Sequence, residues 1–566
     1  MAIDSLGKFF MKDAISDQQL VTPLTMFYKW EKEEKNRVYL RQPVNGVYTE
    51  YTWGEVANEA RSMAAALVSM GVKPGDRVAL ASKNCAHWFM ADFAIMMAGG
   101  VSVPLYPNQM ADTTRYVLEH SGAKILFTGK FDDPKEMEDG IIPGVTTIGF
   151  PYKSSVISRV DHAWDDVVAK HAPIEGKTQH GLDDIMTIIY TSGTTGFPKG
   201  VVHTYRSVAF SAGQAGPLFD IGKSDRAVSF LPLSHVAERL LVEMTSVYYC
   251  TTISFVESLE SFAKNIQEVQ PTLFFAVPRL WVKFQMGILA KLPQKKLDKL
   301  LKIPVVSGLI KTKLRKALGL NQARLIISGA APLAKPVMDW FDKIGLEILE
   351  GYGLTENFAY SSINRPDKRR KGTVGVGLPN SGLSISERGE ILFKSPAVMQ
   401  GYYKEPEKTA EVINEDGALM TGDKGTVDAD GFLKITGRVK EIFKTAKGKY
   451  VAPAPIEGLF AENTNIEQLC VMGNGLTQPV AVLVPSEEAR QLEPSALKKD
   501  FLLTLDRVNK KIESHEKMKQ VIVAKEPWTV EDGMMTPTLK IKRHQVEARY
   551  QKLASEGGGE TVIWEH

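Results

Sequence analysis

The feature that most constrains the fold of this sequence is a glycine- and threonine-rich loop that directly follows a short apolar strand pattern. The strand pattern covers residues 185–190, and the loop reads TSGTTGFPKG over residues 191–200. Backbone N–H groups and hydroxyls in such a loop can surround phosphate oxygens, and a lysine adds a positive charge. The sequence therefore predicts a phosphate-binding loop at the end of a buried strand.

This loop differs from the phosphate loop of P-loop NTPases. That pattern requires Ser or Thr directly after the lysine, because the hydroxyl binds Mg²⁺. Here Pro198 precedes Lys199 and Gly200 follows it. We therefore expect a phosphate loop of another class.

Strand and helix patterns alternate along the first two thirds of the chain. Thr52 and Glu55 have the spacing of a capping box, which predicts the start of a helix. Short apolar runs that predict strands occur at residues 78–81, 185–190, 272–277 and 325–328. This alternation favours an α/β fold with largely parallel sheets. After about residue 380, short strand patterns and Gly/Asp turns favour antiparallel sheet.

The length of the chain predicts more than one domain. It has 566 residues, which exceeds what a single hydrophobic core usually supports. The C-terminal part has its own small pattern, with strands expected at 468–472 and 480–484 and helices at 497–512 and 542–553. We predict a large N-terminal α/β domain with several sheets over residues 1–437 and a small C-terminal α/β domain over 438–566. The Gly-rich stretch 557–566 predicts a frayed tail.

Composition excludes several classes of protein. Lys and Arg number 69 against 66 Asp and Glu, so a dominant electrostatic mode of nucleic-acid binding is excluded. Cys85, Cys250 and Cys470 are far apart, which excludes a disulfide scaffold and a Cys-rich zinc site and fits a reducing compartment. The N-terminus has no uninterrupted apolar stretch typical of a signal peptide. We expect a soluble protein in the cytoplasm.

Two segments bear on membrane contact. The apolar stretch 89–106 contains Asp92, two glycines and Pro104, which favours a buried helix, a turn and a strand over a transmembrane span. The segment 283–322 interleaves Leu and Ile with Lys and Arg. It predicts a solvated helical insertion, and a basic membrane-surface patch is the alternative. Peripheral contact at the inner face of a membrane therefore stays open.

Four further motifs follow the loop in order. They read GYGLTE at 351–356, TGD at 421–423, GRVKE at 437–441 and TPTLKI at 536–541. Together with the loop, they resemble the motif set of the adenylate-forming (AMP-binding) superfamily, which includes acyl-CoA synthetases, adenylation domains and beetle luciferases. The resemblance covers essentially the whole chain. It implies a large multi-sheet adenylate-forming domain with a small, mobile C-terminal lid domain.

The resemblance implies a set of ATP- or AMP-binding residues. Tyr352 can stack its ring on a purine, Asp423 can accept hydrogen bonds from both ribose hydroxyls, and Arg438 reaches the ribose by resemblance. Glu356 offers a hard oxygen to Mg²⁺, and the resemblance places Thr191 on the same metal. The full nucleotide set is Thr191, Ser192, Gly193, Thr194, Thr195, Gly196, Lys199, Gly329, Ala330, Tyr352, Gly353, Asp423 and Arg438.

Three residues are expected to be catalytic. The resemblance brings Lys540 over the α-phosphate, where it would neutralise charge in the transition state. Thr355 offers a hydroxyl to the same phosphate. His235 lies beside the acyl carboxylate by resemblance, and a core or helix-start histidine is the alternative.

The resemblance implies a second half-reaction, in which the CoA thiol attacks the acyl-adenylate, and this step requires a moving lid. The resemblance places the hinge at Lys440, and rotation about it would move Lys540 away and open a channel for the thiol. Lys444, Gly448 and Lys449 would then lie on the face presented to CoA.

The acid substrate is indicated by motifs that resemble the long-chain branch of acyl-CoA synthetases. These read FLPLSHVAER at 230–239, FAVPR at 275–279 and IISGAAP at 326–332. The turn Gly329–Ala331 lets backbone pass close to a ligand, and no Asp lies around 274–278 to match an amino-acid ammonium group. We predict an ATP-dependent long-chain fatty acid–CoA ligase that uses Mg²⁺, with fatty acid, ATP and CoA as partners, as a monomer or a homodimer.

Three alternatives stay open. A fatty acyl-AMP ligase would deliver the acyl group to the phosphopantetheine thiol of a carrier protein; an insertion that blocks the lid would favour it, and none is evident near residue 440. Luciferase-like oxygenation would use the same fold, but no residue selects for it. A non-catalytic nucleotide binder is disfavoured because all the expected charged groups are present.

Overall fold

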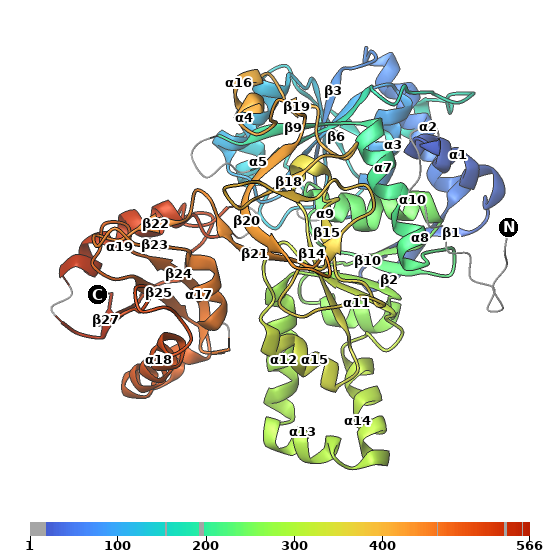
Figure 1. Cartoon of the computed structure of the whole chain (residues 1–566). Coiled ribbons are helices and arrows are strands. Elements are labelled where there is room, and N and C mark those ends of the chain that lie inside the picture. Colours follow the sequence, from blue (N-terminus) through green and yellow to red (C-terminus); the bar gives the residue numbers. More distant parts are fainter. Residues whose placement is uncertain are drawn as a thin grey trace.

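The computed structural model describes residues 19–152, 156–191, 197–460, 462–536, 540–556 and 559–565. Figure 1 shows three parts: a large region formed by the N-terminal and middle segments, a smaller region formed by the C-terminal segment, and a helical arm that projects from the large region.

One sheet of the large region has nine strands in the order β16-β15-β14-β13-β12-β10-β11-β1-β2. The pairs from β14 to β1 are parallel, as the sequence predicts, and the pairs at both edges are antiparallel. Ligands of parallel sheets bind outside the carboxyl ends of the strands, and the chain leaves β10, β13 and β14 there toward His235, Gly329 and Thr355. The strands are β1 (Val38–Val44), β2 (Val47–Thr52), β10 (Arg226–Ser229), β11 (Thr252–Phe255), β12 (Leu273–Ala276), β13 (Leu325–Ser328), β14 (Ile348–Tyr352), β15 (Ser362–Ile363) and β16 (Val376–Gly377).

The second large sheet has eight strands in the order β19-β9-β8-β4-β3-β5-β6-β7. The strands from β8 to β7 are parallel, whereas β9 and β19 run antiparallel to their neighbours. The strands are β3 (Arg77–Ala81), β4 (Val101–Leu105), β5 (Ile125–Thr128), β6 (Thr146–Gly149), β7 (His162–Ala163), β8 (Ile185–Thr191), β9 (Lys199–Thr204) and β19 (Gly401–Tyr402).

Helix α3 (Ala86–Met97) joins the cores of the two sheets. Every residue of α3 is buried, as expected for a helix that is apolar on all sides. Its side chains belong to one hydrophobic cluster with residues of β3 and β11. The expected helix, turn and strand over 89–106 are therefore confirmed, with α3 followed by β4. No helix in the described part of the chain is both long enough and apolar enough to cross a membrane.

The predicted capping box forms at the start of α2, one of the helices of the large region. The Thr52 hydroxyl accepts from the Glu55 N–H, and the Glu55 carboxylate accepts from the Thr52 N–H. The helices are α1 (Pro23–Glu33), α2 (Trp53–Ser69), α4 (Ala111–Ser121), α5 (Lys135–Asp139), α6 (Trp164–Lys170), α7 (Tyr205–Gly213), α8 (Ala215–Phe219), α9 (Val236–Glu238), the π-helix η2 (Arg239–Met244), α10 (Thr245–Tyr249), α11 (Phe262–Val269), α15 (Lys335–Lys343), η3 (Thr355–Asn357) and α16 (Pro406–Ala410).

A third sheet follows residue 380 and is antiparallel, as expected. Its order is β17-β18-β20-β21. The register of β20 and β21 places Asp423 opposite Arg438. The strands are β17 (Ser384–Ile385), β18 (Glu390–Phe393), β20 (Leu419–Val427) and β21 (Leu433–Arg438).

The helical arm corresponds to the Lys-rich segment, for which the predicted helical insertion is confirmed. It consists of α12 (Pro278–Lys291), α13 (Gln294–Leu301) and α14 (Pro304–Ala317). The far end of the arm, at α13 and α14, lies away from the sheets (Figure 1).

The C-terminal region has a four-stranded sheet in the order β24-β25-β26-β27. The prediction of a frayed tail is wrong, because β27 pairs with β26 and buries Val562 and Ile563. The apolar residues of this strand complete the core. The elements are β22 (Phe443–Lys444), β23 (Tyr450–Val451), α17 (Pro453–Phe460), β24 (Ile466–Met472), β25 (Val480–Pro485), η4 (Ala489–Gln491), α18 (Pro494–Asn509), β26 (Gln520–Val523), α19 (Arg543–Glu556) and β27 (Val562–Trp564).

Candidate active site

The two ends of the predicted phosphate loop are held together by the sheet. Thr191 ends β8 and pairs with Lys199, the first residue of β9. Ser192, Gly193, Thr194, Thr195 and Gly196 lie outside the described residues. The hairpin pairing therefore fixes where the loop begins and ends.

Tyr402 connects the loop lysine to the acidic motif. The Nζ atom of Lys199 lies 4.3 Å from the centroid of the Tyr402 ring, within cation–π distance. The Tyr402 hydroxyl donates to Oε1 of Glu356 at 2.8 Å. Sequence analysis missed Tyr402, since no spacing distinguishes it from the neighbouring Tyr403. Its place beside Glu356 results from β19 pairing with β9.

Thr355 and Glu356 lie in the short helix η3, directly after β14. His203, fully buried on β9, donates from Nε2 to the Thr355 carbonyl at 2.6 Å. Burial lowers the pKa of His203 to about 4, so the ring is neutral at pH 7. Gly353 is required here, because a Cβ atom would lie 2.6 Å from the carbonyl oxygen of Ala359. His203 was also missed by sequence analysis.

The carboxylate of Asp423 is oriented by two donors. The Tyr352 hydroxyl donates to Oδ2 at 2.6 Å, and Nε of Arg438 lies 2.9 Å from Oδ1. Asp423 itself is 4% exposed. The structure thus brings together three residues that sequence analysis assigned to the nucleotide.

Gly329 lies beside this group. A Cβ atom on Gly329 would lie 3.2 Å from the Gly351 carbonyl oxygen and 3.4 Å from the Phe275 ring. The following residue, Ala330, has a positive φ of 67° and is exposed. The turn therefore runs close against β14, next to Tyr352.

Lys540 reaches this site from the C-terminal region. The Thr536 N–H donates to the Lys540 carbonyl at 2.8 Å, which closes a turn before α19. The side chain keeps accessible surface, yet crowding by protein atoms lowers its pKa; Arg438 lowers the pKa further, and Glu356 and Asp423 raise it. Lys540 therefore lies within electrostatic range of Arg438, Glu356 and Asp423.

His235 feels the charge of Lys540 as well. Burial lowers the pKa of His235 to about 3, and the charge of Lys540 lowers it further. Its Nδ1 accepts from the Ala237 N–H at 3.2 Å and caps α9. His235 is therefore a helix-start histidine, and it also lies within electrostatic range of Lys540.

A buried polar network fixes the segment after His235. Glu238 accepts from the Ser229 hydroxyl at 2.8 Å and from Asn84 Nδ2 at 3.2 Å. Burial raises the pKa of Glu238 to about 8. Arg239 is fully buried and pairs with Asp92 at 2.9 Å. The π-helix η2 begins at Arg239, and such distortions of helices often occur at functional sites.

A narrow apolar cavity of about 50 Å³ lies between η2 and the nine-stranded sheet. Leu241 and Val242 of η2 line one side, and Phe275, which also contacts the Gly329 turn, lines the other. Phe275 thus lies between the cavity and the Gly329 turn. Its lining residues are Ala215, Phe219, Ile221, Ala227, Val228, Leu241, Val242, Thr245, Leu273, Phe274, Phe275, Leu325 and Ile327.

The expected hinge residue follows β21, and the expected CoA-side residues lie in and beside the next hairpin. Lys440 is exposed just beyond β21. Lys444, Gly448 and Lys449 form the exposed hairpin of β22 and β23, where Gly448 has a positive φ of 76°. In the parts of the chain that the structure describes, no hydrogen bond or ion pair joins these side chains to the nucleotide residues.

Comparisons with known proteins cover both regions. The family described as AMP-binding enzyme matches residues 27–403, and the AMP-binding enzyme C-terminal domain matches residues 440–556. Long-chain-fatty-acid--CoA ligase FadD15 of Mycobacterium bovis is 30% identical over 93% of this chain and 95% of its own. Long-chain-fatty-acid--CoA ligase 5 of Rattus norvegicus is 29% identical over 90% of this chain and 84% of its own.

Among solved structures, the chain is similar to the adenylation domain of the carboxylate reductase from Mycobacterium chelonae. The TM-score is 0.79 at 25% sequence identity, and the match covers 95% of this chain and 91% of that domain. The similarity includes the mixed α/β architecture of both the large and the small region.

Proposed function

Because the chain belongs to the family of AMP-binding enzymes, we propose that it is an ATP-dependent long-chain fatty acid–CoA ligase. A fatty acid carboxylate attacks the α-phosphate of ATP to give acyl-AMP and pyrophosphate, and the CoA thiolate then displaces AMP. The observation that carries the proposal is the geometry of the motif residues: Tyr352 and Arg438 orient Asp423, and Tyr402 orients Glu356. Lys540 of the C-terminal region lies near enough for its charge to lower the pKa of His235. Two relatives named as long-chain fatty acid–CoA ligases support the substrate class.

The first half-reaction needs positioning and charge neutralisation more than proton transfer. The carboxylate of the acid is already ionised near neutral pH, so no general base is required. Lys540 would neutralise charge that develops on the α-phosphate, and Thr355 would donate a hydroxyl to it. His235, neutral at pH 7 because of its low pKa, would lie beside the acyl carboxylate without adding a competing charge.

The nucleotide would lie between the loop and the third sheet. Residues Thr191 to Lys199 would bind the phosphates, and Tyr352 with Gly329, Ala330 and Gly353 would form the adenine side. Asp423 would accept from the ribose hydroxyls beside Arg438. Each carboxylate oxygen can accept more than one hydrogen bond, so the bonds from Tyr352 and Arg438 orient Asp423 and leave acceptor capacity.

Mg²⁺ fits the donor set at the start of the loop. It prefers hard oxygen ligands and takes few from the protein, keeping waters and substrate phosphates. Glu356 supplies a carboxylate whose Oε1 is already oriented by Tyr402, and Thr191 supplies a hydroxyl. The ion would offset phosphate charge. No cluster of three or more His, Cys, Asp or Glu ligands occurs among the described residues, which agrees with a site that relies on few protein ligands.

The second half-reaction would use a different pose of the C-terminal part. We place the boundary between domains at 437/438, with rotation about Lys440 that removes Lys540 and presents Lys444, Gly448 and Lys449 to CoA. The exposure of all these residues, and the hairpin that carries the last three, support this role. Residues that are exposed at a junction can change backbone angles without breaking a core.

The acyl chain would enter the apolar cavity between η2 and the sheet. At about 50 Å³ the cavity is narrower than a long alkyl chain requires, so η2 would move outward as the chain enters. Apolar walls without a buried charge favour an alkyl chain over an amino acid.

The decisive experiment is pyrophosphate release with ATP and Mg²⁺ over acids from acetate to oleate and aromatic acids, with and without CoA. The proposal predicts turnover on long-chain acids that depends on CoA. Release that does not respond to CoA would favour delivery to a carrier-protein thiol, and silence on every acid would refute the proposal.

The end of the helical arm supports peripheral contact with an anionic membrane. Ile303, Val305 and Leu309 are 49%, 78% and 69% exposed, and no residue of α14 is buried. The flanking lysines would meet the anionic headgroups while the apolar side chains enter the interface. This location would bring the enzyme to its acid. In a vesicle sedimentation assay, Val305→Asp with Leu309→Asp should abolish binding to phosphatidylserine vesicles; unchanged binding would refute the contact.

A further inference from the structure

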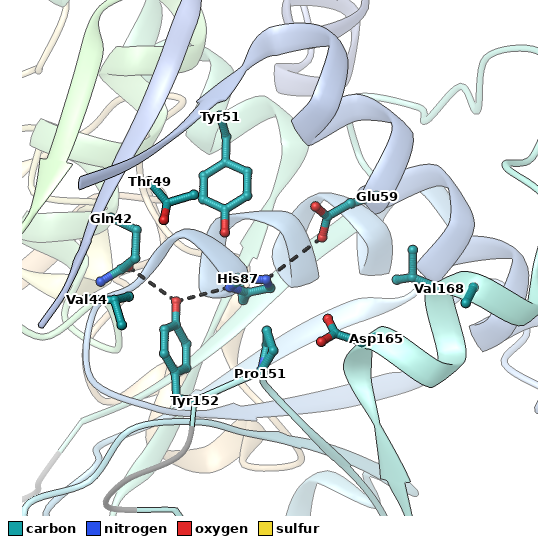
Figure 2. A pocket seen from close by; sticks show the side chains of 11 residues that line it. Gln42, Val44, Thr49, Tyr51, Glu59, His87, Pro151, Tyr152, Asp165 and Val168 are labelled. Carbon is teal, nitrogen blue, oxygen red and sulfur yellow. Dashed lines mark hydrogen bonds and ion pairs between the residues drawn. The ribbon is translucent and has the colours of Figure 1, made fainter. Parts of the chain in front are cut away.

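A second, larger cavity of about 500 Å³ lies at the edge of the large region. Residues of β1, β2, α2, α3 and α6 line it, and none of them belongs to the nucleotide, acyl or CoA sets described above. Figure 2 shows His87 in the middle, between Tyr152 and Glu59. The cavity is lined by Gln42, Val44, Thr49, Tyr51, Glu59, His87, Pro151, Tyr152, Asp165, Val168 and Ala169.

A chain of hydrogen bonds fixes the tautomer of His87. The Ala86 N–H donates to Oε1 of Gln42 at 3.0 Å, which identifies that atom as an acceptor. The Tyr152 hydroxyl must therefore donate to Gln42 Oε1, at 3.3 Å. The same hydroxyl lies 3.0 Å from Nδ1 of His87, so Nδ1 carries the proton and donates to it. Nε2 is left with a lone pair.

This lone pair faces another acceptor. Nε2 of His87 lies 3.8 Å from Oε2 of Glu59, too far for a direct hydrogen bond. His87 is 4% exposed, and burial lowers its pKa to about 3, so the ring stays neutral at pH 7. The Glu59 Oε2 atom accepts from Nε1 of Trp164 at 3.0 Å, which fixes the carboxylate. Two held acceptors thus face each other, and neither can donate to the other.

The charges of the cavity are negative and uncompensated. Glu59 and Asp165 both line it, and in the described part of the chain no Lys or Arg side chain is ion-paired with either carboxylate. Burial and the nearby charge of Asp165 raise the pKa of Glu59, whereas the hydrogen bond from Trp164 lowers it. Lys130 lies 5.7 Å from the Tyr152 ring, but its Nζ donates to the Glu257 carbonyl.

Aromatic rings form the remaining walls. The Tyr51 and Tyr152 rings lie 6.0 and 5.4 Å from the His87 ring and nearly perpendicular to it. Faces of aromatic rings attract cations. Val44, Pro151 and Val168 add apolar surface at the rim.

We propose that this cavity binds a small organic cation with N–H donors, namely a primary alkylammonium. Its N–H groups would bridge His87 Nε2 and the Glu59 carboxylate, and Asp165 would add a second negative charge. The alkyl part would lie against the tyrosine rings and the apolar rim. The site is independent of the proposed ligase reaction, since no residue is shared.

The test is calorimetric titration of the full chain with n-butylammonium chloride, with 1-butanol as the neutral probe of equal length and NaCl added to equal ionic strength. The expected result is saturable binding of one butylammonium per chain and none of 1-butanol. Equal heats for both probes, or no saturable binding of butylammonium, would overturn the proposal.

Variants then locate the site. Glu59→Gln should weaken binding by about tenfold or more, because a charge-assisted hydrogen bond is lost. Gln can still accept from Trp164, so the melting temperature should change little. Asp165→Asn should weaken binding by a few-fold. Asp166→Asn is the matched control, since this neighbour on α6 removes the same charge but does not line the cavity; an equal effect of the Asp165 and Asp166 variants would refute the site.

Discussion

The residues proposed to hold the nucleotide and the lysine proposed to act on its phosphate are held in position by different parts of the molecule. Asp423 and Arg438 face each other on two paired strands, β20 and β21, and Tyr352 completes the group from β14. Lys540 lies in a turn of the C-terminal region, between Thr536 and α19. A hydrogen bond and an ion pair between strands hold the first group together, whereas Lys540 reaches it from the C-terminal region, and the proposal requires this lysine to leave. This difference is what a reaction with two successive poses requires.

The largest effect is expected from Lys540→Ala. The account predicts a loss of about 10²-fold or more in adenylate formation, because charge on the α-phosphate is no longer neutralised. Thioester formation from supplied acyl-AMP should stay within a few-fold of the wild type. Separate assays of the two half-reactions measure this, with Lys542→Ala as the control. Equal loss of both half-reactions would remove the distinction between the fixed and the moving part.

The next largest effect is expected from Glu356→Gln. Replacing the carboxylate with an amide of the same shape should cost at least about tenfold in rate and raise the Mg²⁺ concentration needed for half-maximal rate. Titration of Mg²⁺ against pyrophosphate release measures it. Glu407→Gln, an exposed carboxylate on α16, is the control. An unchanged Mg²⁺ dependence would take Glu356 out of the metal site.

Val242→Phe tests whether the acyl chain occupies the cavity beside η2. Filling the cavity beside η2 should lower kcat/KM for palmitate by about tenfold, an amount typical of steric discrimination in apolar pockets. The rate with hexanoate should change little, which makes the short acid an internal control for folding. If both acids lose equally, the chain does not occupy this cavity.

The smallest effect is expected from Tyr402→Phe. The ring stays over Lys199, but the hydrogen bond to Glu356 is lost, and a few-fold to about tenfold decrease in adenylation rate should follow. Tyr402→Leu removes the ring as well and should cost more. Pre-steady-state pyrophosphate release compares the two variants. Equal rates for the two variants would mean that the ring does not help to position Lys199.

Much of the fold followed from local patterns in the sequence. The capping box at Thr52 fixed the start of α2, and the alternation of strand and helix patterns predicted the parallel parts of both large sheets. The tail was mispredicted because three apolar residues gain their strand only by pairing with β26. A pairing between segments far apart leaves no local signal.

The same limit applies to the site. Lys199, Tyr352, Glu356, Asp423 and Lys540 lie in motifs, so the sequence identified them, and the structure brings them together. Tyr402 reaches Glu356 because β19 pairs with β9, and His203 reaches the Thr355 carbonyl because β9 packs against η3. Glu238 differs from other glutamates only because burial raises the pKa of its carboxyl group, and the sequence alone does not reveal that burial. Such contacts depend on three-dimensional packing rather than on spacing along the chain.

The central claim is that one enzyme alternates between two poses, and the most direct measurement is to block the hinge. Lys440→Pro would restrict the backbone at the junction, and no described backbone hydrogen bond uses the Lys440 N–H. Single-turnover assays of the two half-reactions should then show adenylate formation near the wild-type rate and thioester formation strongly reduced, the reverse of Lys540→Ala. Thioester formation at the wild-type rate in Lys440→Pro, with adenylation also intact, would contradict the account.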